Sequence, residues 1–489
     1  VSAGDRVALL APNSARWAAV DLAIMAEGAI TVPLYARQDP KQLAGMLRDC
    51  TPLVLVASDD ALASAIREAW PEGSSIVRYD ELFASPGAAP EGAVAGEGPV
   101  TIIYTSGTSG EPKGVVLTAS NVDFMLDVTV ARIREMAQSH RSEDRVFHYM
   151  PFCFAGSRIM LWSQLRRGNP LMISTDLNNL QEEMRTASPH YFMNVPALLE
   201  RIKKGVEAKL TRMGTLHSLY RRGAAAYAAH ENGTLGMRER MWLTLATRTL
   251  FPRIKRLIGA NLEFLVCGSA RLSEDTQRFF EMLGIPVYQV YGLTETTGIV
   301  TIDDTRNVVP GRVGYAVPGC EIELSDEGEL LCRGPNVFAG YWNKPDATAQ
   351  MIREGYLHTG DQAEIDPRGS VRIIGRLKDV IVPESGHNVA PAAIEELLLQ
   401  ADTGIEQAFV VGHGRPYLTA LVTGPIDPAA LDAVRDQVNA RLPHYQRLRH
   451  LRRVDEAFTP ENGLLTANQK QRRPAIEAHF RGVIEEMYR

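Results

Sequence analysis

The first seventy residues alternate short apolar runs with stretches of helical periodicity, and this alternation constrains the fold more than any other feature. The expected strands cover residues 7–10, 30–34 and 53–56, and the expected helices cover residues 17–28, 41–48 and 61–70. Strands that are separated by helices are typical of a parallel sheet with helices packed on its faces. The alternation therefore predicts a layered α/β domain with a largely parallel sheet.

The composition excludes several classes of protein. A chain of 489 residues is too long for one hydrophobic core, so we expect two or more domains. The formal net charge of −6 argues against a nucleic-acid-binding protein. Five cysteines without a C-x-x-C pair argue against a disulfide framework or a zinc site and indicate a reduced compartment. We find no signal peptide and no apolar run long enough to span a bilayer.

Residues 101–118 read T-I-I-Y-T-S-G-T-S-G-E-P-K-G-V-V-L-T and predict a strand, a loop and a second strand. The loop combines glycines, hydroxyl side chains and one lysine: Gly107, Gly110, Gly114, Thr105, Ser106, Thr108, Ser109 and Lys113. Glycines let backbone N–H groups approach an anion closely, and the hydroxyls and the lysine add donors and positive charge. We interpret the loop as a phosphate-binding loop, and a mobile surface hairpin is the alternative. The loop is not of the G-x-x-x-x-G-K-[ST] type, because Gly114 follows the lysine.

The string T-S-G-T-S-G-x-P-K-G resembles the signature of the adenylate-forming (AMP-binding) superfamily, and four further motifs follow in that superfamily's order. The motifs resemble those of long-chain fatty acyl-CoA synthetases in particular. The resemblance implies a large layered α/β domain with mixed and parallel sheets, followed by a small mobile α+β domain. We place the first domain at residues 1–375 and the second at residues 376–489. Members of the superfamily usually carry a further stretch before the position of Val1, so we expect a truncated start.

Two motifs carry the adenine and metal residues that the resemblance implies. The nucleotide-binding residues in these motifs are Gly268, Ser269, Ala270, Tyr291, Gly292 and Thr294. Gly268 follows a predicted strand, at the edge where open α/β sheets bind ligands, and Tyr291 can stack on a purine. In the superfamily, the positions of Glu295 and Thr105 flank Mg²⁺, a hard cation that prefers oxygen ligands.

The motif Y-L-H-T-G-D ends at Asp361, whose carboxylate is suited to accept hydrogen bonds from ribose hydroxyls. The resemblance makes Arg376, which follows a predicted hairpin, a second ribose ligand. Lys378 matches the superfamily's hinge position. Ser385 and Gly386 begin a motif that helps to line the channel for the thiol acceptor.

Near the end of the chain, N-G-L-L-T-A-N-Q-K-Q-R-R is similar to the terminal motif of long-chain synthetases. Its lysine, Lys470, matches the catalytic lysine of the first half-reaction. At Phe154 the chain departs from the superfamily, which shows a histidine beside the reacting carboxylate. A phenyl ring donates no hydrogen bond, so Phe154 is assigned either to the acyl pocket or to the core.

Residues 203–259 form the most basic part of the chain, with twelve Lys and Arg against three acids between Lys203 and Arg256. Apolar residues recur there at helical spacing. One interpretation is a face that contacts an anionic membrane; the other is the solvated surface of ordinary helices. The expected localisation is cytoplasmic, with contact to the inner face of a membrane under the first interpretation.

The resemblance implies ATP-dependent activation of a long-chain fatty acid to an acyl-adenylate, followed by thioester formation with CoA. Mg²⁺ is the implied cofactor, and the fatty acid, ATP and CoA are the implied partners. The alternatives are an acyl-AMP ligase that loads a carrier protein, a CoA ligase for an aromatic or medium-chain acid, and a non-catalytic acyl-binding protein. The sequence indicates neither the chain length of the acid nor the oligomeric state.

Overall fold

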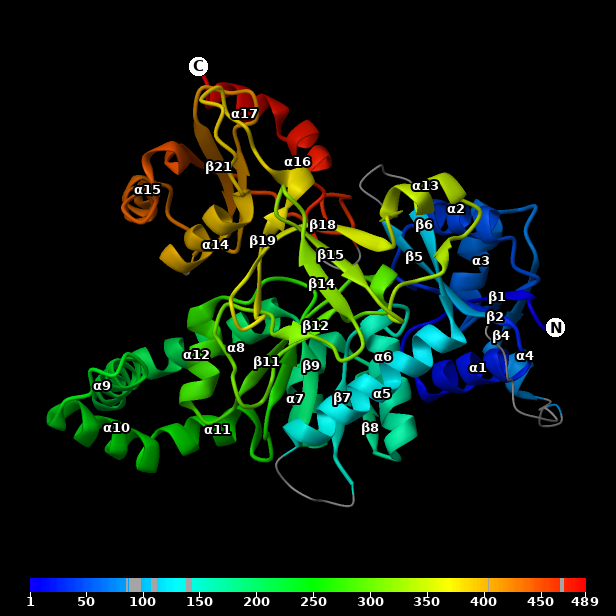
Figure 1. Ribbon diagram of the computed structural model, residues 1–489, viewed down its shortest axis with the longest axis horizontal. Helices are drawn as coiled ribbons and strands as arrows, with labels where there is room; N and C mark the ends of the chain where they lie inside the picture. Colours follow the sequence, from blue (N-terminus) through cyan, green and yellow to red (C-terminus); the bar gives the residue numbers. More distant parts are fainter. Residues whose placement is uncertain (85–86, 88–97, 107–111, 138–142, 403, 467–469) are drawn as a thin grey trace.

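The computed structural model describes residues 1–84, 87, 98–106, 112–137, 143–402, 404–466 and 470–489. Within these residues the strands form two seven-stranded sheets, one five-stranded sheet and one three-stranded sheet (Figure 1). The two large sheets and the five-stranded sheet lie together in one body. The three-stranded sheet and its helices form a separate lobe at the C-terminal end of the chain.

The first sheet has the order β16-β6-β5-β2-β1-β3-β4. Its strands are β1 (Arg6–Leu10), β2 (Ile30–Leu34), β3 (Val54–Ala57), β4 (Ser75–Arg78), β5 (Pro99–Ser106), β6 (Pro112–Thr118) and β16 (Gly340–Tyr341). The five strands from β5 to β4 pair in parallel, whereas β6 and β16 are antiparallel. Its first helices are α1 (Ala15–Ala26), α2 (Pro40–Cys50), α3 (Asp60–Ala69) and α4 (Tyr79–Ala84). Side chains of Ser14, Asp39 and Asp59 accept hydrogen bonds from the first turns of α1, α2 and α3, which fixes where these helices begin.

The second sheet has the order β13-β12-β11-β10-β9-β7-β8, and its pairs from β8 to β11 are parallel. Its strands are β7 (Val146–His148), β8 (Leu171–Ile173), β9 (Tyr191–Asn194), β10 (Leu265–Cys267), β11 (Val287–Tyr291), β12 (Thr301–Ile302) and β13 (Tyr315–Ala316). The helices nearest to it in sequence are α5 (Ala119–Met136), α6 (Ala155–Arg167), α7 (Leu180–Ala187), α8 (Pro196–Thr211) and α12 (Glu274–Met282). A fully buried ion pair between Asp21 of α1 and Arg158 of α6 joins the helices of the two sheets.

The helices between β9 and β10 include a hairpin that projects from the body (Figure 1). It consists of α9 (Gly214–Glu231) and α10 (Met237–Thr249), and α11 (Phe251–Gly259) leads back to the sheet. These helices fall within the basic segment of residues 203–259, so the helical pattern predicted there is confirmed. No helix in the described part of the chain is long and apolar enough to cross a bilayer.

The five-stranded sheet is antiparallel and connects the two large sheets to the C-terminal lobe. Its strands are β14 (Glu321–Leu324), β15 (Glu329–Arg333), β17 (Ile352–Arg353), β18 (Tyr356–Ile365) and β19 (Val371–Arg376), and α13 (Pro345–Met351) precedes β17. The predicted hairpin that ends at Arg376 is therefore present, as β18 and β19.

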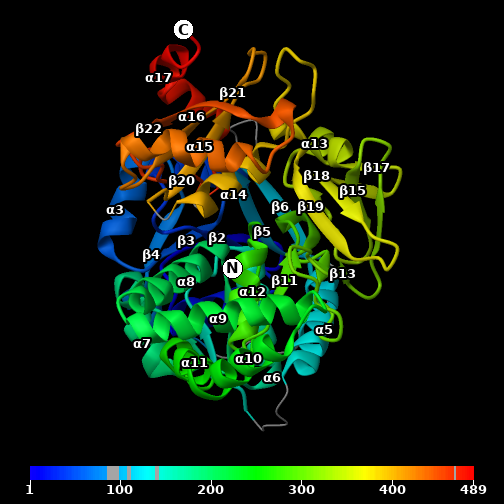
Figure 2. The ribbon, with the colours of Figure 1, turned by 90° about the vertical axis from the view of Figure 1, so that its left-hand side faces the viewer.

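The C-terminal lobe has cores of its own, made of residues that follow Val380. Its elements are α14 (Pro391–Ala401), β20 (Gln407–Val411), β21 (Leu418–Thr423), α15 (Leu431–Asn439), β22 (Leu448–Arg453), α16 (Arg473–His479) and α17 (Arg481–Glu486). Seen from the side, these elements lie above the large sheets (Figure 2). The predicted fold class, a large layered α/β part with mixed sheets and a small α+β part, is confirmed.

Two local predictions differ from the structure. The apolar run of residues 146–151 is strand-like in sequence, but the strand ends at His148. Beyond that point the backbone bonds to the Asn13 side chain, which donates to the Met150 carbonyl at 2.7 Å and accepts from the Phe152 N–H at 2.8 Å. These bonds replace strand pairing. The edge strand β4 was not predicted at all, because four partly exposed residues show no clear alternation.

Candidate active site

Strands β5 and β6 bring the two ends of the predicted phosphate loop together. Thr105 lies opposite Lys113 in the register of this pair. The loop residues Gly107, Thr108, Ser109 and Gly110 lie outside the described residues, and Ser106 is described only as the last residue of β5. Gly114 lies in β6, where an added Cβ would approach the Ile102 Cγ2 atom to 2.7 Å, so the strand has no room for a side chain there.

Tyr341 connects the lysine of this loop to the predicted metal ligand. The Nζ atom of Lys113 lies 5.1 Å from the centroid of the Tyr341 ring, a cation–π contact. The hydroxyl of the same tyrosine donates to Glu295 Oε1 at 2.7 Å. Burial and the charge of Glu295 raise the pKa of Tyr341, so the phenol keeps its proton and remains a donor.

Glu295 lies in a short 3-10 helix, η2 (Thr294–Thr296), directly after β11. An added Cβ on Gly292 would lie 2.3 Å from the Gly298 carbonyl oxygen, so only glycine allows this turn to close. The turn places Thr294 and Glu295 at the end of β11, where the parallel strands of the second sheet end. The predicted residues Tyr291, Gly292, Thr294 and Glu295 are thus on one tightly closed loop.

Asp361, Arg376 and Tyr291 form a second group. Asp361 and Arg376 are register partners on β18 and β19, and Arg376 Nε lies 2.7 Å from Asp361 Oδ1. The Tyr291 hydroxyl donates to Asp361 Oδ2 at 2.6 Å. Burial raises the pKa of Asp361, and Arg376 and the Tyr291 hydrogen bond oppose that effect. The two predicted ribose ligands therefore lie side by side. Tyr291, which was predicted to stack on the purine, is hydrogen-bonded to one of them, Asp361.

The predicted adenine loop follows β10. Gly268 is buried and donates its N–H to the Asn194 carbonyl at 3.1 Å, while an added Cβ would come within 3.1 Å of the Val290 carbonyl oxygen. Ser269 has a φ of +71°, a conformation that non-glycine residues rarely adopt. Ser269 and Ala270 are both exposed, so their polar backbone groups are available to a ligand.

Lys470 belongs to the C-terminal lobe, and charges of the body act on its ammonium. The protein around its ammonium lowers the pKa of Lys470, the charge of Arg376 lowers it further, and the charges of Asp361 and Glu295 oppose this. The lysine therefore lies within electrostatic range of both predicted ribose ligands and of the predicted metal ligand. The residue keeps contact with solvent, so the lowered pKa reflects the surrounding protein rather than complete enclosure.

Two hydrogen bonds join Lys470 to Thr466. Its N–H donates to Thr466 Oγ1 at 3.1 Å, and its carbonyl accepts from the Thr466 N–H at 2.8 Å. An ion pair joins the lobe to the body, because Arg271 Nε, next to the adenine loop, lies 3.1 Å from Glu396 Oε2 on α14. The C-terminal lobe thus meets the body beside the predicted adenine loop.

Lys378, Ser385 and Gly386 are the remaining predicted residues near the start of the C-terminal lobe. Lys378 is exposed in the 3-10 helix η3 (Leu377–Asp379), directly after Arg376. Ser385 and Gly386 are exposed in a turn where Gly386 has a φ of +77°. The predicted roles of these residues remain predictions.

Phe154 precedes the first residue of α6 and is half-buried. Its ring centroid lies 5.8 Å from that of Tyr35. The start of α6 adjoins the Tyr291–Gly298 loop, because an added Cβ on Gly298 would lie 3.4 Å from the Gly156 backbone. Phe154 therefore lies two residues before the part of α6 that adjoins the site loop, and it packs on an aromatic neighbour. This environment is consistent with an apolar wall.

The residues present fit one magnesium ion of the kind that binds phosphates. Mg²⁺ in such sites takes one or two carboxylates and completes its shell with phosphate oxygens and water. Glu295 supplies a carboxylate from η2, directly after β11, and Thr105 supplies a hydroxyl near the end of β5. Among the described residues no cluster of three or more His, Cys, Asp or Glu side chains could hold a metal on its own.

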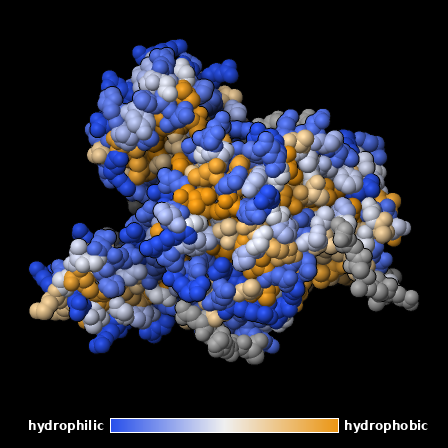
Figure 3. All heavy atoms as spheres, viewed as in Figure 1, coloured by the Kyte–Doolittle hydropathy of each residue, from blue (hydrophilic) through white to orange (hydrophobic). Residues whose placement is uncertain are grey.

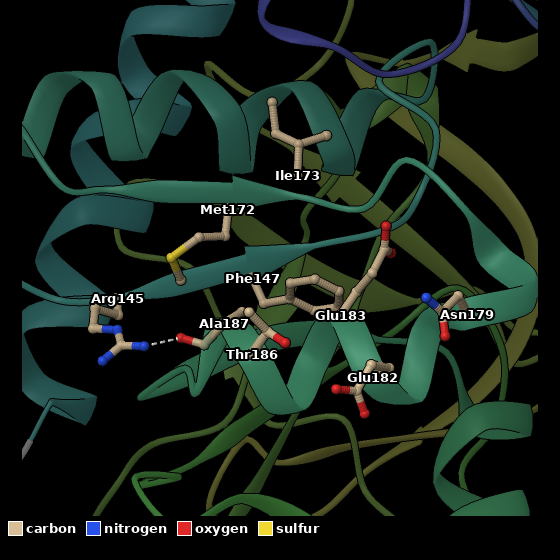
Figure 4. A pocket seen from close by; sticks show the side chains of 9 residues that line it. All are labelled: Arg145, Phe147, Met172, Ile173, Asn179, Glu182, Glu183, Thr186 and Ala187. Carbon is tan, nitrogen blue, oxygen red and sulfur yellow. Dashed lines mark hydrogen bonds between the residues drawn. The ribbon is translucent and has the colours of Figure 1, made fainter.

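A depression of about 360 Å³ lies elsewhere, between α7 and the edge of the second sheet (Figure 4). Arg145, Phe147, Met172 and Glu183 are among the residues that line it. It contains none of the predicted nucleotide residues. The Arg145 guanidinium is already bonded to the Ala187 carbonyl, and Glu183 bonds Ser174 and Thr175, so these polar groups are used within the fold.

Sequence reasoning missed two residues of this region. Tyr341 bridges Lys113 and Glu295, yet it lies on a two-residue strand about which the local pattern says nothing. Arg271 directly follows Ala270 of the predicted adenine loop and makes the contact with Glu396, but no feature of the sequence indicated it. Each depends on a partner far away in the chain, so no local signal could have identified it.

The fold and this arrangement define a nucleotide-binding α/β enzyme with a small C-terminal domain. The AMP-binding enzyme family matches residues 1–342, and the AMP-binding enzyme C-terminal domain matches residues 378–489. The chain therefore belongs to the AMP-binding enzyme family.

Among curated proteins, the chain is similar to the long-chain-fatty-acid–CoA ligase FadD15 of Mycobacterium tuberculosis. The two are 29% identical over the whole of this chain and 88% of that protein. Among solved structures, ATP-bound MatB from Rhodopseudomonas palustris has a TM-score of 0.76 at 23% identity and covers 99% of this chain and 90% of its own. The o-succinylbenzoate CoA synthetase of Bacillus subtilis, in complex with its acyl-adenylate, has a TM-score of 0.76 at 20% identity and covers 98% and 89%. The two structures support the fold.

Proposed function

We propose that this chain is an AMP-forming ligase that activates a long-chain fatty acid with ATP and transfers the acyl group to CoA. One observation carries the proposal: Lys470 of the C-terminal lobe lies within electrostatic range of Asp361, Arg376 and Glu295 of the body. A cation that is brought to a nucleotide site from a separate lobe suits a reaction between two anions. The name of the mycobacterial relative supports the choice of acid and acceptor.

In the first step a carboxylate oxygen of the fatty acid attacks the α-phosphorus of ATP. A new O–P bond forms, the bond from the α-phosphorus to the bridging oxygen breaks, and pyrophosphate leaves with the electron pair. Both reactants are anionic, so fixed cations and backbone amides are the effective catalysts. Lys470 is assigned to the carboxylate and the α-phosphate, and Lys113 with the loop of residues 105–114 to the departing pyrophosphate.

Glu295 and Thr105 are assigned to Mg²⁺, which neutralises phosphate charge when it is bound. Tyr341 holds the Glu295 carboxylate by a hydrogen bond of 2.7 Å and thereby orients it toward that task. The paired Asp361 and Arg376 are assigned to the ribose. Ser269 and Ala270 are assigned to the adenine, and the half-buried Phe154 to the acyl pocket.

In the second step the CoA thiol gives up its proton, its sulfur attacks the acyl carbon, and AMP leaves with its phosphate oxygen. The thiol needs the space near the acyl carbon, so we assign a rotation at Lys378 that withdraws Lys470 and presents the turn of Ser385 and Gly386. Such closures gate many enzymes. The separate cores of the C-terminal lobe support domains of residues 1–375 and 376–489.

Release of AMP, measured with CoA over a panel of acids from acetate to long-chain fatty acids, tests the proposal. The expected result is CoA-dependent AMP release that is highest with long-chain acids. Acyl transfer to a carrier protein and not to CoA would favour the acyl-AMP ligase. Highest rates with aromatic or medium-chain acids would correct the substrate. Absence of ATP–pyrophosphate exchange with every acid would overturn the proposal.

A further inference from the structure

The two helices of the α9–α10 hairpin pack closely against each other. Helix α9 presents Gly223 to α10, where an added Cβ would lie 2.6 Å from the Cβ of Ala246 and 3.0 Å from the Phe251 ring. Only a residue without a side chain allows the two helices to approach so closely. The Arg222 guanidinium also lies 4.4 Å from the centroid of the Trp242 ring. The hairpin therefore projects as a fixed pair of helices (Figure 1).

The outer face of α10 carries an apolar stripe that no described element covers. Met237, Met241 and Leu245 have 90%, 56% and 43% of their surface exposed. They are spaced by four residues, so successive members are roughly 40° apart around the helix and lie on one side of it. Ala246 is buried, and it marks the opposite side as the one that packs on α9. Exposure of these three side chains to water is unfavourable, because each is large and apolar and they lie together on one face.

Arginines flank this stripe on both sides. Arg238 and Arg240 are exposed at the start of α10 and Arg248 at its end. At roughly 100° per residue, Arg238 falls beyond Leu245, Arg240 falls on the other side of Met237, and Arg248 lies between them. Arg238 and Arg240 thus form cationic edges of the apolar stripe, and Arg248 lies in line with the stripe at its C-terminal end.

The acids of the segment do not neutralise those edges. The Glu207 side chain accepts a hydrogen bond from the Tyr220 hydroxyl at 3.0 Å, and Glu231 pairs with Arg278 at 3.3 Å. The third acid, Glu239, folds back over the start of α10, where its Oε2 lies 2.4 Å from the position of a Cβ on Gly236. The projecting face is thus cationic, although the whole chain carries a net charge of −6.

We propose that the outer face of α10 docks on the surface of an anionic lipid bilayer, with the helix axis in the membrane plane. Met237, Met241 and Leu245 enter the boundary between head groups and acyl chains, and the flanking arginines bind lipid phosphates. An amphipathic face with basic edges has the charge and polarity that such an interface accepts. The exposed arginines are complementary to the phosphates of an anionic lipid surface, and the apolar stripe suits the layer beneath the head groups. Three apolar residues make the contact reversible.

Binding of the purified full-length chain to vesicles, measured by flotation without ATP or fatty acid, tests the proposal separately from ligase activity. We expect binding to equimolar phosphatidylcholine and phosphatidylglycerol, weaker binding to phosphatidylcholine alone, and loss of binding at high salt. The variant Met237→Ser/Met241→Ser/Leu245→Ser should bind at least roughly ten-fold more weakly. Arg238→Gln/Arg240→Gln/Arg248→Gln should lose the preference for the anionic lipid, by roughly five-fold per arginine.

A matched control replaces three exposed leucines elsewhere, Leu53→Ser/Leu177→Ser/Leu324→Ser, and should bind as the parent does. Hydrogen exchange of the unmodified chain adds a readout that needs no variant: vesicles should protect residues 237–249. Equal binding by the control and the stripe variant, or no protection of α10, would overturn the proposal. Dimerisation that the stripe variant abolishes in the absence of lipid would overturn it in favour of a second copy.

Discussion

At the scale of single residues, Tyr341 is the side chain that the proposed chemistry needs and that the sequence did not reveal. It contacts Lys113 through its ring and Glu295 through its hydroxyl. The ring contact and the hydrogen bond can be separated by substitution, because phenylalanine keeps the ring and removes the donor.

Tyr341→Phe should lower the rate of adenylation by roughly 10- to 100-fold, since a hydrogen bond to a charged group contributes about 1.5–3 kcal/mol. The loss should appear mainly as a higher requirement of the adenylation rate for Mg²⁺ and ATP, because the Glu295 carboxylate loses the hydrogen bond that orients it. ATP–pyrophosphate exchange at several Mg²⁺ concentrations measures it. Tyr104→Phe removes a comparable tyrosine hydroxyl, bonded to Asp49 at 2.6 Å, and is the control. Equal losses in the two variants would contradict a specific role of Tyr341.

The pKa of Lys470 predicts a pH dependence. The proposed role needs the protonated ammonium, and the pKa of Lys470 lies below the ordinary value of 10.5 because the protein around it and Arg376 disfavour the charge. As pH rises through the lowered pKa, kcat/KM for adenylation should therefore fall at a pH below 10.5. Lys470→Arg, whose side chain keeps its proton, should remove that alkaline decline. A decline that is unchanged in Lys470→Arg would show that another group causes it.

At the scale of elements, the loop between β11 and η2 is held by backbone packing. Gly292→Ala would place a Cβ 2.3 Å from the Gly298 carbonyl oxygen. The turn must then open and carry Glu295 away from Tyr341. We expect ATP affinity to fall by at least roughly ten-fold, as measured by calorimetry, with a loss of stability of about 1–3 kcal/mol.

Gly482→Ala serves as the control, since a Cβ there meets nothing within 4 Å. It should leave ATP affinity unchanged and should not lower stability, because alanine suits the helix α17 better than glycine does. If Gly292→Ala bound ATP as well as this control, the closed turn would not be needed for nucleotide binding.

The elements differ in how far the sequence could predict them. Alternating strands and helices were predicted in the first seventy residues, since each strand there is an apolar run and each helix shows helical spacing of its apolar residues. Strand β16 could not be predicted, because it has two residues and exists only by pairing with β6, more than two hundred positions earlier. Tyr341 lies on this strand, so it could not be predicted either, whereas Glu295 was predicted from its sequence motif.

At the scale of the whole molecule, the contact between Arg271 and Glu396 joins the adenine loop to the C-terminal lobe. Both side chains are partly exposed, with 29% and 21% of their surface accessible, so the pair contributes no more than about 1 kcal/mol. That amount is still enough to shift the balance between two arrangements of the lobes several-fold.

Glu396→Ala should therefore slow adenylation by roughly three- to five-fold and leave thioester formation from preformed acyl-AMP unchanged or faster. Separate assays of the two half-reactions measure this. The charge reversal Arg271→Glu/Glu396→Arg should recover part of the loss. Glu486→Ala, which breaks an ion pair with Arg452 inside the C-terminal lobe, is the control and should change neither rate. Equal slowing of both half-reactions would contradict a role for the pair in lobe arrangement.

The central claim is that a lysine from the C-terminal lobe serves the first half-reaction at a nucleotide site in the body. The most direct measurement is the rate of each half-reaction in Lys470→Ala. A single preorganised cation of this kind predicts that adenylation slows by roughly 10²- to 10³-fold, while thioester formation from preformed acyl-AMP is much less affected. An equal loss in both half-reactions, or unchanged adenylation, would contradict the account.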